Sequence, residues 1–317
     1  MITAVAPNAD LRQHYDEHGV VHVADLIDPS EVDGIRTSFM AQVHEDRSAV
    51  GFDDNVPADD VLARFPRFVH PHRRPDLAVG RLARRYMLDR RIVDRVEAMV
   101  GAPVHGAQSM FYFKPPGARG QALHQDNTAL HAHPETCIAV WIAVDPVDDY
   151  NGGLRLVPGS HRYALVCPSD EADQATSFSK NTLVLPDGLT TQPSQMRPGD
   201  ALFFHGNIVH GSGPNHSADR FRRSLIFHYV PQASVAIARF YLPLVGPDGK
   251  DVLIVGSNEG GVCGEAWVTD KGHLFHRNDI EEALEHGGTQ SFDEAIGFLI
   301  LRTDNPDNNG LQANLLT

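Results

Sequence analysis

The sequence contains few cysteines and no long apolar run. Its three cysteines, Cys137, Cys167 and Cys263, are odd in number and widely separated. This spacing argues against a disulfide framework and against a C-x-x-C zinc site, and it fits a reducing cytoplasm. The N-terminal residues lack the basic segment and apolar run of a signal peptide, and no stretch reaches the roughly 20 apolar residues of a membrane span. The sequence therefore predicts a cytoplasmic protein without a membrane segment.

Basic residues are also scarce. The chain has 27 Lys and Arg against 41 Asp and Glu, a formal net charge of −14, and its basic residues form no run. This balance argues against nucleic acid and against an anionic membrane surface as partners. The 317 residues and the 42% hydrophobic content are sufficient for a sizeable globular core.

The pattern of the chain changes from helical to β near residue 104. Helices are predicted at residues 10–18, 29–45 and 80–100, and a short strand at 20–24. Residues 46–75 are rich in Asp, Pro, His and Arg and predict a surface excursion with short helices at most. From about 104 to 230, short β-branched and aromatic runs alternate with Pro and Gly turns. This alternation is typical of a jelly roll or barrel.

Two further segments flank or interrupt the β region. Residues 162–195 include the acidic tract 169–174 and predict a loop insertion, either a lid or a disordered segment. Residues 245–317 predict a strand at Val252–Val255 and helices near 279–286 and 292–302. We therefore predict a single domain (1–317), with an N-terminal helical support and loop (1–103), a β core (104–240) and a C-terminal extension packed on that core (241–317).

Two histidines and one aspartate form the clearest chemical pattern. His124 and Asp126 flank Gln125, and His210 follows in the string His-Gly-Ser-Gly-Pro-Asn. Residues i and i+2 of a strand point to the same side, so His124 and Asp126 can reach one ion. Two imidazoles and a carboxylate occupy one face of an octahedral metal and leave three positions for a co-substrate and oxygen, as in non-haem Fe(II) oxygenases. Taken alone, each histidine is more often a hydrogen-bonded core residue than a metal ligand, and the prediction depends on the three residues together.

The surroundings of these residues resemble the phytanoyl-CoA dioxygenase family of Fe(II)/2-oxoglutarate enzymes. The similar stretches are Gly120–Asp126, Ile138–Asp145, Asn151–Leu154, Val157–His161, Pro198–Phe204, His210–Asn215 and Arg222–Ser224, preceded by an opening stretch at 15–23. No similarity extends beyond about residue 245. The resemblance implies a mainly β fold with flanking helices and a double-stranded β-helix (jelly-roll or cupin-like) core. In that core His124 and Asp126 lie at a strand end and His210 on a later strand.

The resemblance also implies Fe(II), 2-oxoglutarate and O2 as cofactor and co-substrates. Arg222 corresponds to the family's arginine, whose planar guanidinium binds the distal carboxylate of 2-oxoglutarate. Ser212 matches the serine two residues after the second histidine. The interval from His210 to Arg222 is one residue longer than in the family, which leaves Arg220 and Arg223 as alternatives. Trp141 corresponds to a tryptophan that borders the co-substrate pocket, with an ordinary core aromatic as the alternative.

The other histidines carry weaker expectations. His131 and His133 follow the H-x-D pair in a segment that lines the substrate mouth of similar enzymes, so either one is a candidate substrate contact or an ordinary loop histidine. Strand alternation does not place His205, His216 or His228 at the ion, and structural roles are expected for these three.

The resemblance predicts a dioxygenase that hydroxylates an unactivated C–H bond of a small metabolite or natural-product intermediate, with release of succinate and CO2. Related halogenases carry Gly or Ala in place of the carboxylate, so Asp126 favours hydroxylation, with desaturation or ring closure left open. The alternative is a cupin-like metal-dependent isomerase or a non-oxidative small-molecule binding protein. Proteins of that alternative class would lack the carboxylate clamp of Ser212 and Arg222.

Overall fold

The fold was analysed in a computed structural model of the chain. It describes residues 1–6, 9–51, 56–134, 137–163, 165–166, 168, 170–185, 188–257, 266–268 and 274–276. The helices predicted near 279–286 and 292–302 lie outside these residues. Within the described ranges, no helix combines the length and apolar character needed to cross a membrane.

The first two predicted helices and the strand between them are confirmed. Helix α1 (Leu11–His18) ends at Gly19, whose φ of 68° is a left-handed conformation that glycine adopts without strain. Strand β1 (Val20–Val23) follows directly. Helix α2 (Pro29–Asp46) begins after Asp28, whose side chain accepts a hydrogen bond from the backbone N–H of Ser30.

The single helix predicted at 80–100 is two helices. Helix α4 (Ala78–Met87) stops at Leu88, and helix α5 (Arg90–Val100) begins after it. The break occurs at Asp89, whose side chain accepts from the backbone N–H of Arg91 and so caps the second helix. Gly101 then ends α5 in the left-handed conformation, as the Gly-then-Pro pattern predicted.

The prediction of a surface excursion at 46–75 was wrong for its second half. The segment contains two 3-10 turns, η1 (Arg47–Ala49) and η2 (Pro71–Arg73), the short helix α3 (Val61–Arg64) and strand β2 (Phe68–Val69). β2 pairs with β3 (Val104–Tyr112), where Phe68 lies opposite Phe111. The fully buried Phe68 side chain joins this strand to the core. The polar residues around Phe68 gave no indication in the sequence of a buried strand.

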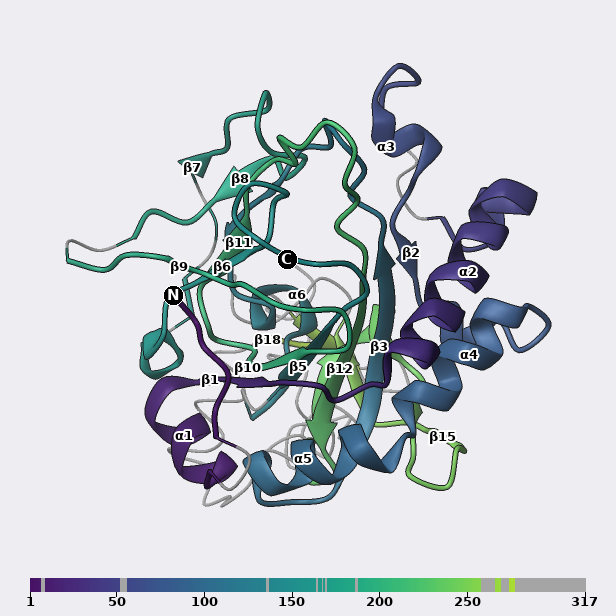
Figure 1. Cartoon of the computed structure of the whole chain (residues 1–317). Helices are drawn as coiled ribbons and strands as arrows, with labels where there is room; N and C mark the ends of the chain where they lie inside the picture. Colours follow the sequence, from purple (N-terminus) through teal and green to yellow (C-terminus); the bar gives the residue numbers. More distant parts are fainter. Residues whose placement is uncertain are drawn as a thin grey trace, which may run out of the picture.

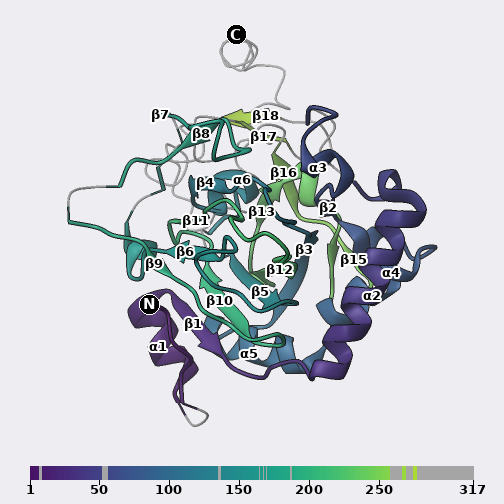
Figure 2. The same ribbon diagram turned by 45° about the horizontal axis from the view of Figure 1, so that its top comes forward.

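The β region forms a main sheet and a smaller facing sheet (Figures 1 and 2). The main sheet has the order β1-β10-β5-β12-β3-β14-β15, with β2 on β3, and its other strands are β5 (Ile138–Ala143), β10 (Ala201–His205), β12 (Ser224–Pro231), β14 (Leu244–Val245) and β15 (Asp251–Val252). The minor sheet has the order β4-β11-β6-β9, formed by β4 (Gln121–His124), β11 (His210–Ser212), β6 (Leu154–Leu156) and β9 (Gln192–Pro193). Neighbouring strands in both sheets are antiparallel, and neither sheet closes on itself. This is the predicted mainly β, jelly-roll type of core with flanking helices.

Strand alternation divides the side chains of the main sheet between two cores. In β5, Val140 and Ile142 pack with the helical side, where α2 and α4 cover the sheet (Figure 1). Ala139 and Trp141 instead face the minor sheet, because successive strand residues point to opposite faces. The same alternation turns a set of even-numbered residues toward the minor sheet: Gln108, Met110, Tyr112, Leu202, Phe204, Ile226 and His228.

The 162–195 segment lies against the outer edge of the minor sheet. It forms a two-stranded hairpin, β7 (Asp170–Glu171) and β8 (Asn181–Thr182), after the 3-10 turn η3 (Ser160–Arg162). The backbone N–H of Gly120 donates to Thr176 O, and that of Leu183 donates to Leu123 O. Residues 170–183 therefore pack beside β4, whereas β9, near the end of the segment, pairs with β6 at the other edge of the sheet.

The beginning of the C-terminal extension packs on the β core. β14 and β15 extend the main sheet, and β16 (Val255–Ser257) runs parallel to β13 (Ala236–Ala238) in a third sheet with β17 (Ala266–Val268) and β18 (Leu274–His276). The strand predicted at Val252–Val255 is thus two short strands in different sheets. The 3-10 turn η4 (Arg239–Tyr241) follows β13 and carries the exposed Phe240 and the buried Tyr241.

Phe111 is expected to dominate the stability of the helical-side core. Its side chain is fully buried, stacks on Phe39 with ring centroids 4.0 Å apart, and meets Phe113 edge-on. Phe111→Ala should lower the free energy of unfolding by about 3–5 kcal/mol, because the change removes a buried ring and leaves a cavity. Urea denaturation measures this loss. Phe240→Ala is the control, since the Phe240 side chain is 48% exposed, and an equal loss for both variants would contradict the expectation.

Candidate metal and co-substrate site

Paired strands of the minor sheet bring the three predicted ligand residues together. His210 on β11 lies directly opposite His124, the last residue of β4. Asp126 lies beyond the end of β4, with helical backbone angles (φ −60°, ψ −34°), immediately before the short helix α6 (Asn127–Leu130). We predicted that strand alternation brings His124 and Asp126 to the same side, and this explanation was wrong. The turn from strand into helix directs the Asp126 carboxylate back toward the histidines.

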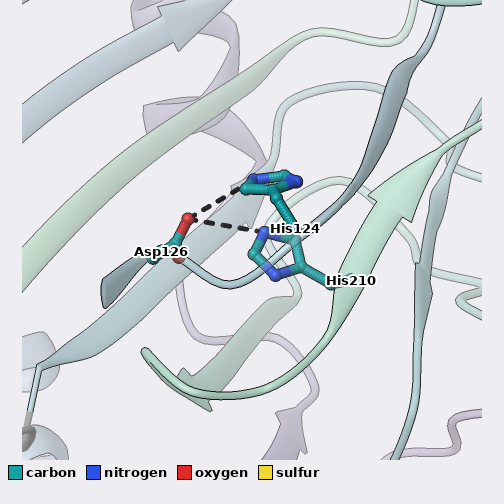
Figure 3. Close-up of side chains that lie close together, drawn as sticks. All are labelled: His124, Asp126 and His210. Carbon is teal, nitrogen blue, oxygen red and sulfur yellow. Dashed lines mark ion pairs between the residues drawn. The ribbon is translucent and has the colours of Figure 1, made fainter. Parts of the chain in front are cut away.

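The carboxylate of Asp126 faces both imidazoles from one side (Figure 3). Its Oδ1 is 3.5 Å from His124 Nε2 and 3.6 Å from His210 Nε2. One ligand atom from each residue lies within 4.8 Å of the others. A first-row metal ion binds imidazole nitrogen and carboxylate oxygen at about 2.0–2.2 Å, which separates adjacent ligand atoms by about 3 Å. Small side-chain movements would therefore place all three atoms on one ion.

Backbone hydrogen bonds select the ring nitrogen that each histidine presents to the cavity. His124 Nδ1 lies 2.9 Å from Ala122 O, and His210 Nδ1 lies 3.0 Å from Ile208 O. A carbonyl oxygen only accepts, so each Nδ1 donates its proton and each Nε2 keeps its lone pair. His124 Nε2 lies 3.0 Å from the Gln121 side-chain amide, a contact that a metal ion at Nε2 would replace. The carbonyl oxygens at the two Nδ1 atoms are outer partners of the kind that commonly orient metal-binding histidines.

His228 orients the third ligand residue. Its Nε2 is 3.2 Å from Asp126 Oδ2, the oxygen that does not face His124 and His210. A structural role was expected for His228, and it is not one of the three grouped ligand residues. It nevertheless lines the cavity and contacts Asp126, because β12 turns its even-numbered residues toward the minor sheet. His216 is exposed, and His205 Nδ1 accepts the backbone N–H of Asn207 in a turn, so neither residue contacts the triad.

Burial and charge set the protonation of the site. Burial lowers the pKa of His210 to about 4, so this imidazole is neutral near pH 7. Burial alone would raise the pKa of Asp126, but His210, His228 and the hydrogen bonds to this carboxyl hold its pKa well below the usual value. A neutral imidazole and an ionised carboxylate are the forms that bind a metal ion.

The triad opens into a cavity of about 470 Å³ between the two sheets. Ser212, Arg222 and Trp141 line it together with the triad. The other lining residues are Arg67, Val69, Gln108, Met110, Tyr112, Gln121, Ala129, Leu130, His131, Leu154, Phe204, Ile226, His228, Ala238, Phe240 and Tyr241. The lining therefore combines a buried arginine with a larger set of apolar and aromatic side chains.

Arg222 is the only one of the three candidate arginines that lines the cavity. It is 1% exposed, its Nε donates to Gly152 O at 3.1 Å, and its guanidinium lies 5.3 Å from the centre of the Trp141 ring. Burial lowers its pKa to about 10, so it remains charged at neutral pH. No carboxylate in the described part of the chain forms an ion pair with Arg222. A buried cation of this kind fits an anionic ligand.

The other two candidate arginines are already paired. Arg220 Nη1 binds Asp148 at 2.7 Å near the surface, and Arg223 Nε binds Asp145 at 2.7 Å. Because these partners engage both guanidinium groups outside the cavity, the geometry favours Arg222 among the three candidates.

The two loop histidines differ in position. His131 lines the cavity at the end of α6, where its backbone is left-handed (φ 52°) and its Nε2 contacts Thr128 O. Burial lowers its pKa. His133 does not line the cavity, and its backbone pairs with Ala236 of β13.

Sequence reasoning did not select three polar residues beside the site: His228, Gln121 and Lys114. Alternation along β12 and the pairing of His228 with Gln108 could have indicated the first. Gln121 lies three residues before His124 on the same short strand. Lys114 lies outside any regular strand, and its place behind Ser212 depends on contacts with two distant loops.

The chain matches the family model described as phytanoyl-CoA dioxygenase (PhyH) over residues 15–224. A multifunctional dioxygenase, prhA of Penicillium brasilianum, is 29% identical over 70% of this chain and 72% of its own length. The peroxisomal phytanoyl-CoA dioxygenase of Mus musculus is 25% identical over 69% and 67%. An Oryza sativa phytanoyl-CoA dioxygenase 1 is 34% identical, but this match spans 39% of the chain and 43% of the plant protein.

Solved structures agree on the fold. The carbocyclase SnoK of nogalamycin biosynthesis superposes with a TM-score of 0.57 at 22% identity, over 74% of this chain and 88% of its own. The epimerase SnoN, crystallised with Fe3+, alpha ketoglutarate and nogalamycin RO, superposes with a TM-score of 0.56 at 22% identity, over 71% and 84%. The protein is of the iron- and 2-oxoglutarate-dependent oxygenase type, with Fe(II) as cofactor and 2-oxoglutarate and O2 as co-substrates. The chain belongs to the phytanoyl-CoA dioxygenase (PhyH) family.

Proposed function

We propose that the protein hydroxylates an unactivated C–H bond of a small metabolite or natural-product intermediate, with release of succinate and CO2. The observation that carries this proposal is the partly buried carboxylate of Asp126, which faces two histidine Nε2 atoms in the same cavity as a buried arginine without a carboxylate partner among the described residues. The retained carboxylate supports hydroxylation over halogenation. We also propose that residues 1–317 belong to one oxygenase domain, because the start of the extension completes sheets of the core.

In this proposal His124, Asp126 and His210 hold the iron. Its chemistry, when it is bound, is the activation of O2 coupled to decarboxylation of 2-oxoglutarate. The chain supplies the geometry: Ala122 O, Ile208 O and His228 fix the orientation of the three side chains, and the surrounding apolar residues limit access of water. Arg222 and Ser212 bind the distal carboxylate of 2-oxoglutarate, and Trp141 supports the guanidinium from one face.

The substrate would occupy the part of the cavity that is lined by apolar and aromatic side chains. His131 is the proposed polar contact there, with His133 outside the lining in this structure. Three segments contribute to this lining: residues from 46–75, residues from 127–136, and Ala238, Phe240 and Tyr241 at the start of the C-terminal extension. No described residue of 162–195 lines the cavity.

A role of 162–195 as a lid remains a prediction. Shortening it should lower product formed per succinate, and unchanged coupling would contradict that role.

The reaction type is tested by following succinate together with the mass of the product under ¹⁸O2. Candidate small molecules are screened first for substrate-dependent succinate formation. Hydroxylation predicts a product that gains one labelled oxygen atom. Because the fold neighbours include an epimerase and a carbocyclase, a product of unchanged mass or one that has lost two hydrogens would overturn hydroxylation while retaining the oxidative class. Absence of succinate formation with every candidate would favour an isomerase or a binding protein.

His228 should control metal affinity without binding the metal. His228→Leu removes the hydrogen bond to Asp126 Oδ2, so we expect the dissociation constant for Fe(II) to rise about 10- to 100-fold, the usual effect of losing an outer partner of a ligand. Anaerobic titration of the apoprotein with Fe(II) measures this change. His228→Gln keeps an N–H donor and should restore most of the affinity, and His216→Leu is the surface control. Wild-type affinity in His228→Leu would contradict the role.

A further inference from the structure

Tyr241 presents a buried hydroxyl group to the cavity. The residue is 6% exposed and lines the cavity. Another buried tyrosine, Tyr229, has a protein acceptor, since its hydroxyl group donates to Met87 O at 2.8 Å. Within the described ranges, no residue accepts a hydrogen bond from the Tyr241 hydroxyl group. A buried hydroxyl group without a partner is costly, and a ligand in the cavity can supply the acceptor that the protein does not.

The ring of Tyr241 is held in place by its surroundings. It packs in an apolar cluster with Leu130 and Leu244. The rings of His70 and Phe240 meet it edge-on, with centroids 5.8 Å and 5.3 Å from that of Tyr241. The position of the hydroxyl group is therefore fixed before a ligand binds, and such preorganisation lowers the entropic cost of binding.

The turn that carries Tyr241 is joined to the segment that follows the candidate ligand Asp126. Helix α6 begins directly after Asp126, and the loop beyond α6 pairs with β13, the strand before η4. In this pairing the backbone N–H of His133 donates to Ala236 O, and that of Val235 donates to His133 O, both at 3.0 Å. These two hydrogen bonds place η4 on the same side of the fold as the triad.

Tyr241 offers a neutral hydrogen-bond donor. Burial, and then the charge of Asp126, raises the pKa of its hydroxyl group, which therefore keeps its proton near neutral pH. Leu130, Ala238 and Phe240 line the cavity with it, and none of these side chains compensates a charge. An ionised group at this point would be costly, whereas a neutral oxygen atom satisfies the donor. The position therefore fits a ketone, lactone or ether oxygen on an apolar compound.

We propose that Tyr241 is a specificity-determining residue for the primary substrate, and that its hydroxyl group donates a hydrogen bond to a neutral oxygen atom of an apolar compound. This inference rests on the proposed function, in which the apolar part of the cavity receives the substrate. Tyr241 lies beyond residues 15–224, the part of the chain that matches the family model. The contact would therefore distinguish this chain from relatives that share only the core.

The test uses two probes that differ only at the acceptor. The bicyclic ketone 1-tetralone carries a carbonyl group where tetralin has a methylene group. Dissociation constants for both are measured by anaerobic calorimetry on the protein with Fe(II) and 2-oxoglutarate. In Tyr241→Phe we expect the affinity for 1-tetralone relative to tetralin to fall about 3- to 10-fold, the scale of one neutral hydrogen bond. An unchanged ratio would overturn the proposal, as would wild-type protein that binds no 1-tetralone up to about 10 mM.

A matched variant and a stability measurement separate recognition from a structural role. Tyr15→Phe is the control and should keep the wild-type ratio, since the Tyr15 hydroxyl group is also buried without a partner but Tyr15 does not line the cavity. Tyr241→Phe should unfold at the wild-type temperature or slightly above it, because the change removes an unpaired polar group. A lower unfolding temperature would indicate a structural hydroxyl group and contradict the proposal. Tighter wild-type binding of tetralin-1-carboxylate than of 1-tetralone would overturn the neutral class of substrate.

Failure of the proposed function would be a separate result. Wild-type protein that binds neither Fe(II) nor 2-oxoglutarate would refute the proposed function. The probe ratio is then measured on the metal-free protein, where the same fall in Tyr241→Phe is expected because the contact involves no metal. Protein that binds Fe(II) and 2-oxoglutarate but shows the same ratio with and without the hydroxyl group would refute only the role of Tyr241.

Discussion

Replacing Asp126 with alanine should abolish Fe(II) binding and succinate formation while leaving the fold intact. The carboxylate is the only anionic group of the triad, so its loss removes both a ligand and the charge that balances the metal. His124→Ala and His210→Ala should have the same effect, because two remaining ligand residues no longer hold an ion against exchange with water. Metal content after dialysis, turnover and thermal unfolding measure the three expected results.

Two surface variants serve as matched controls for this series. His216→Ala and Asp149→Ala change exposed residues of the same two types, and both should retain Fe(II) and activity. Full activity in any one of the triad variants would refute the assignment of that residue as a ligand. A variant that loses activity together with its thermal unfolding transition would instead indicate a structural role.

Replacing Arg222 with methionine should raise the apparent KM for 2-oxoglutarate far more than the same change at Arg220 or Arg223. A lost charge-assisted contact to a carboxylate costs about 2–5 kcal/mol, which corresponds to roughly a 30-fold to several-thousand-fold increase. Methionine preserves contact with Trp141, so the effect isolates the charge. Steady-state kinetics at saturating primary substrate, or calorimetry with 2-oxoglutarate alone, measures the increase.

The paired arginines define the controls for this comparison. Arg220→Met breaks a partly exposed ion pair with Asp148 and should change KM by less than about threefold. Arg223→Met leaves Asp145 without its main partner, so we expect lower thermal stability with little change in KM. A larger KM effect for Arg223 than for Arg222 would show that the wrong arginine was assigned.

The β core was predictable because alternation and turn residues are local properties. The same local signals identified α1, α2 and the stop of α5 at Gly101. They failed at residues 66–72, where Phe68 pairs across to β3, since strand pairing depends on a segment about 40 residues away. The break between α4 and α5 was not predicted, because a single aspartate is also compatible with the exposed face of one continuous helix. In the structure Asp89 caps α5.

Only part of the site could be predicted in this way. The residue types around His124 and His210, and their order, predicted the three residues of the triad. They did not predict the bend beyond the strand that turns Asp126 toward the histidines. The choice of Arg222 needed the ion pairs of its neighbours, which no spacing reveals. Lys114 and His228 were missed because their importance lies in single hydrogen bonds to Ser212 and Asp126, and these bonds exist only after both sheets have formed.

The hydrogen bond from His228 engages one of the two carboxylate oxygens of Asp126. Oδ1 faces the two histidines while Oδ2 is held by His228 on the other side, so Oδ1 would be the atom available to a metal ion. Binding through one oxygen would leave three of six octahedral positions for the co-substrate and oxygen, whereas binding through both would leave two. The imidazole of His228, which is not one of the three ligand residues, would thus help to keep a position open for oxygen.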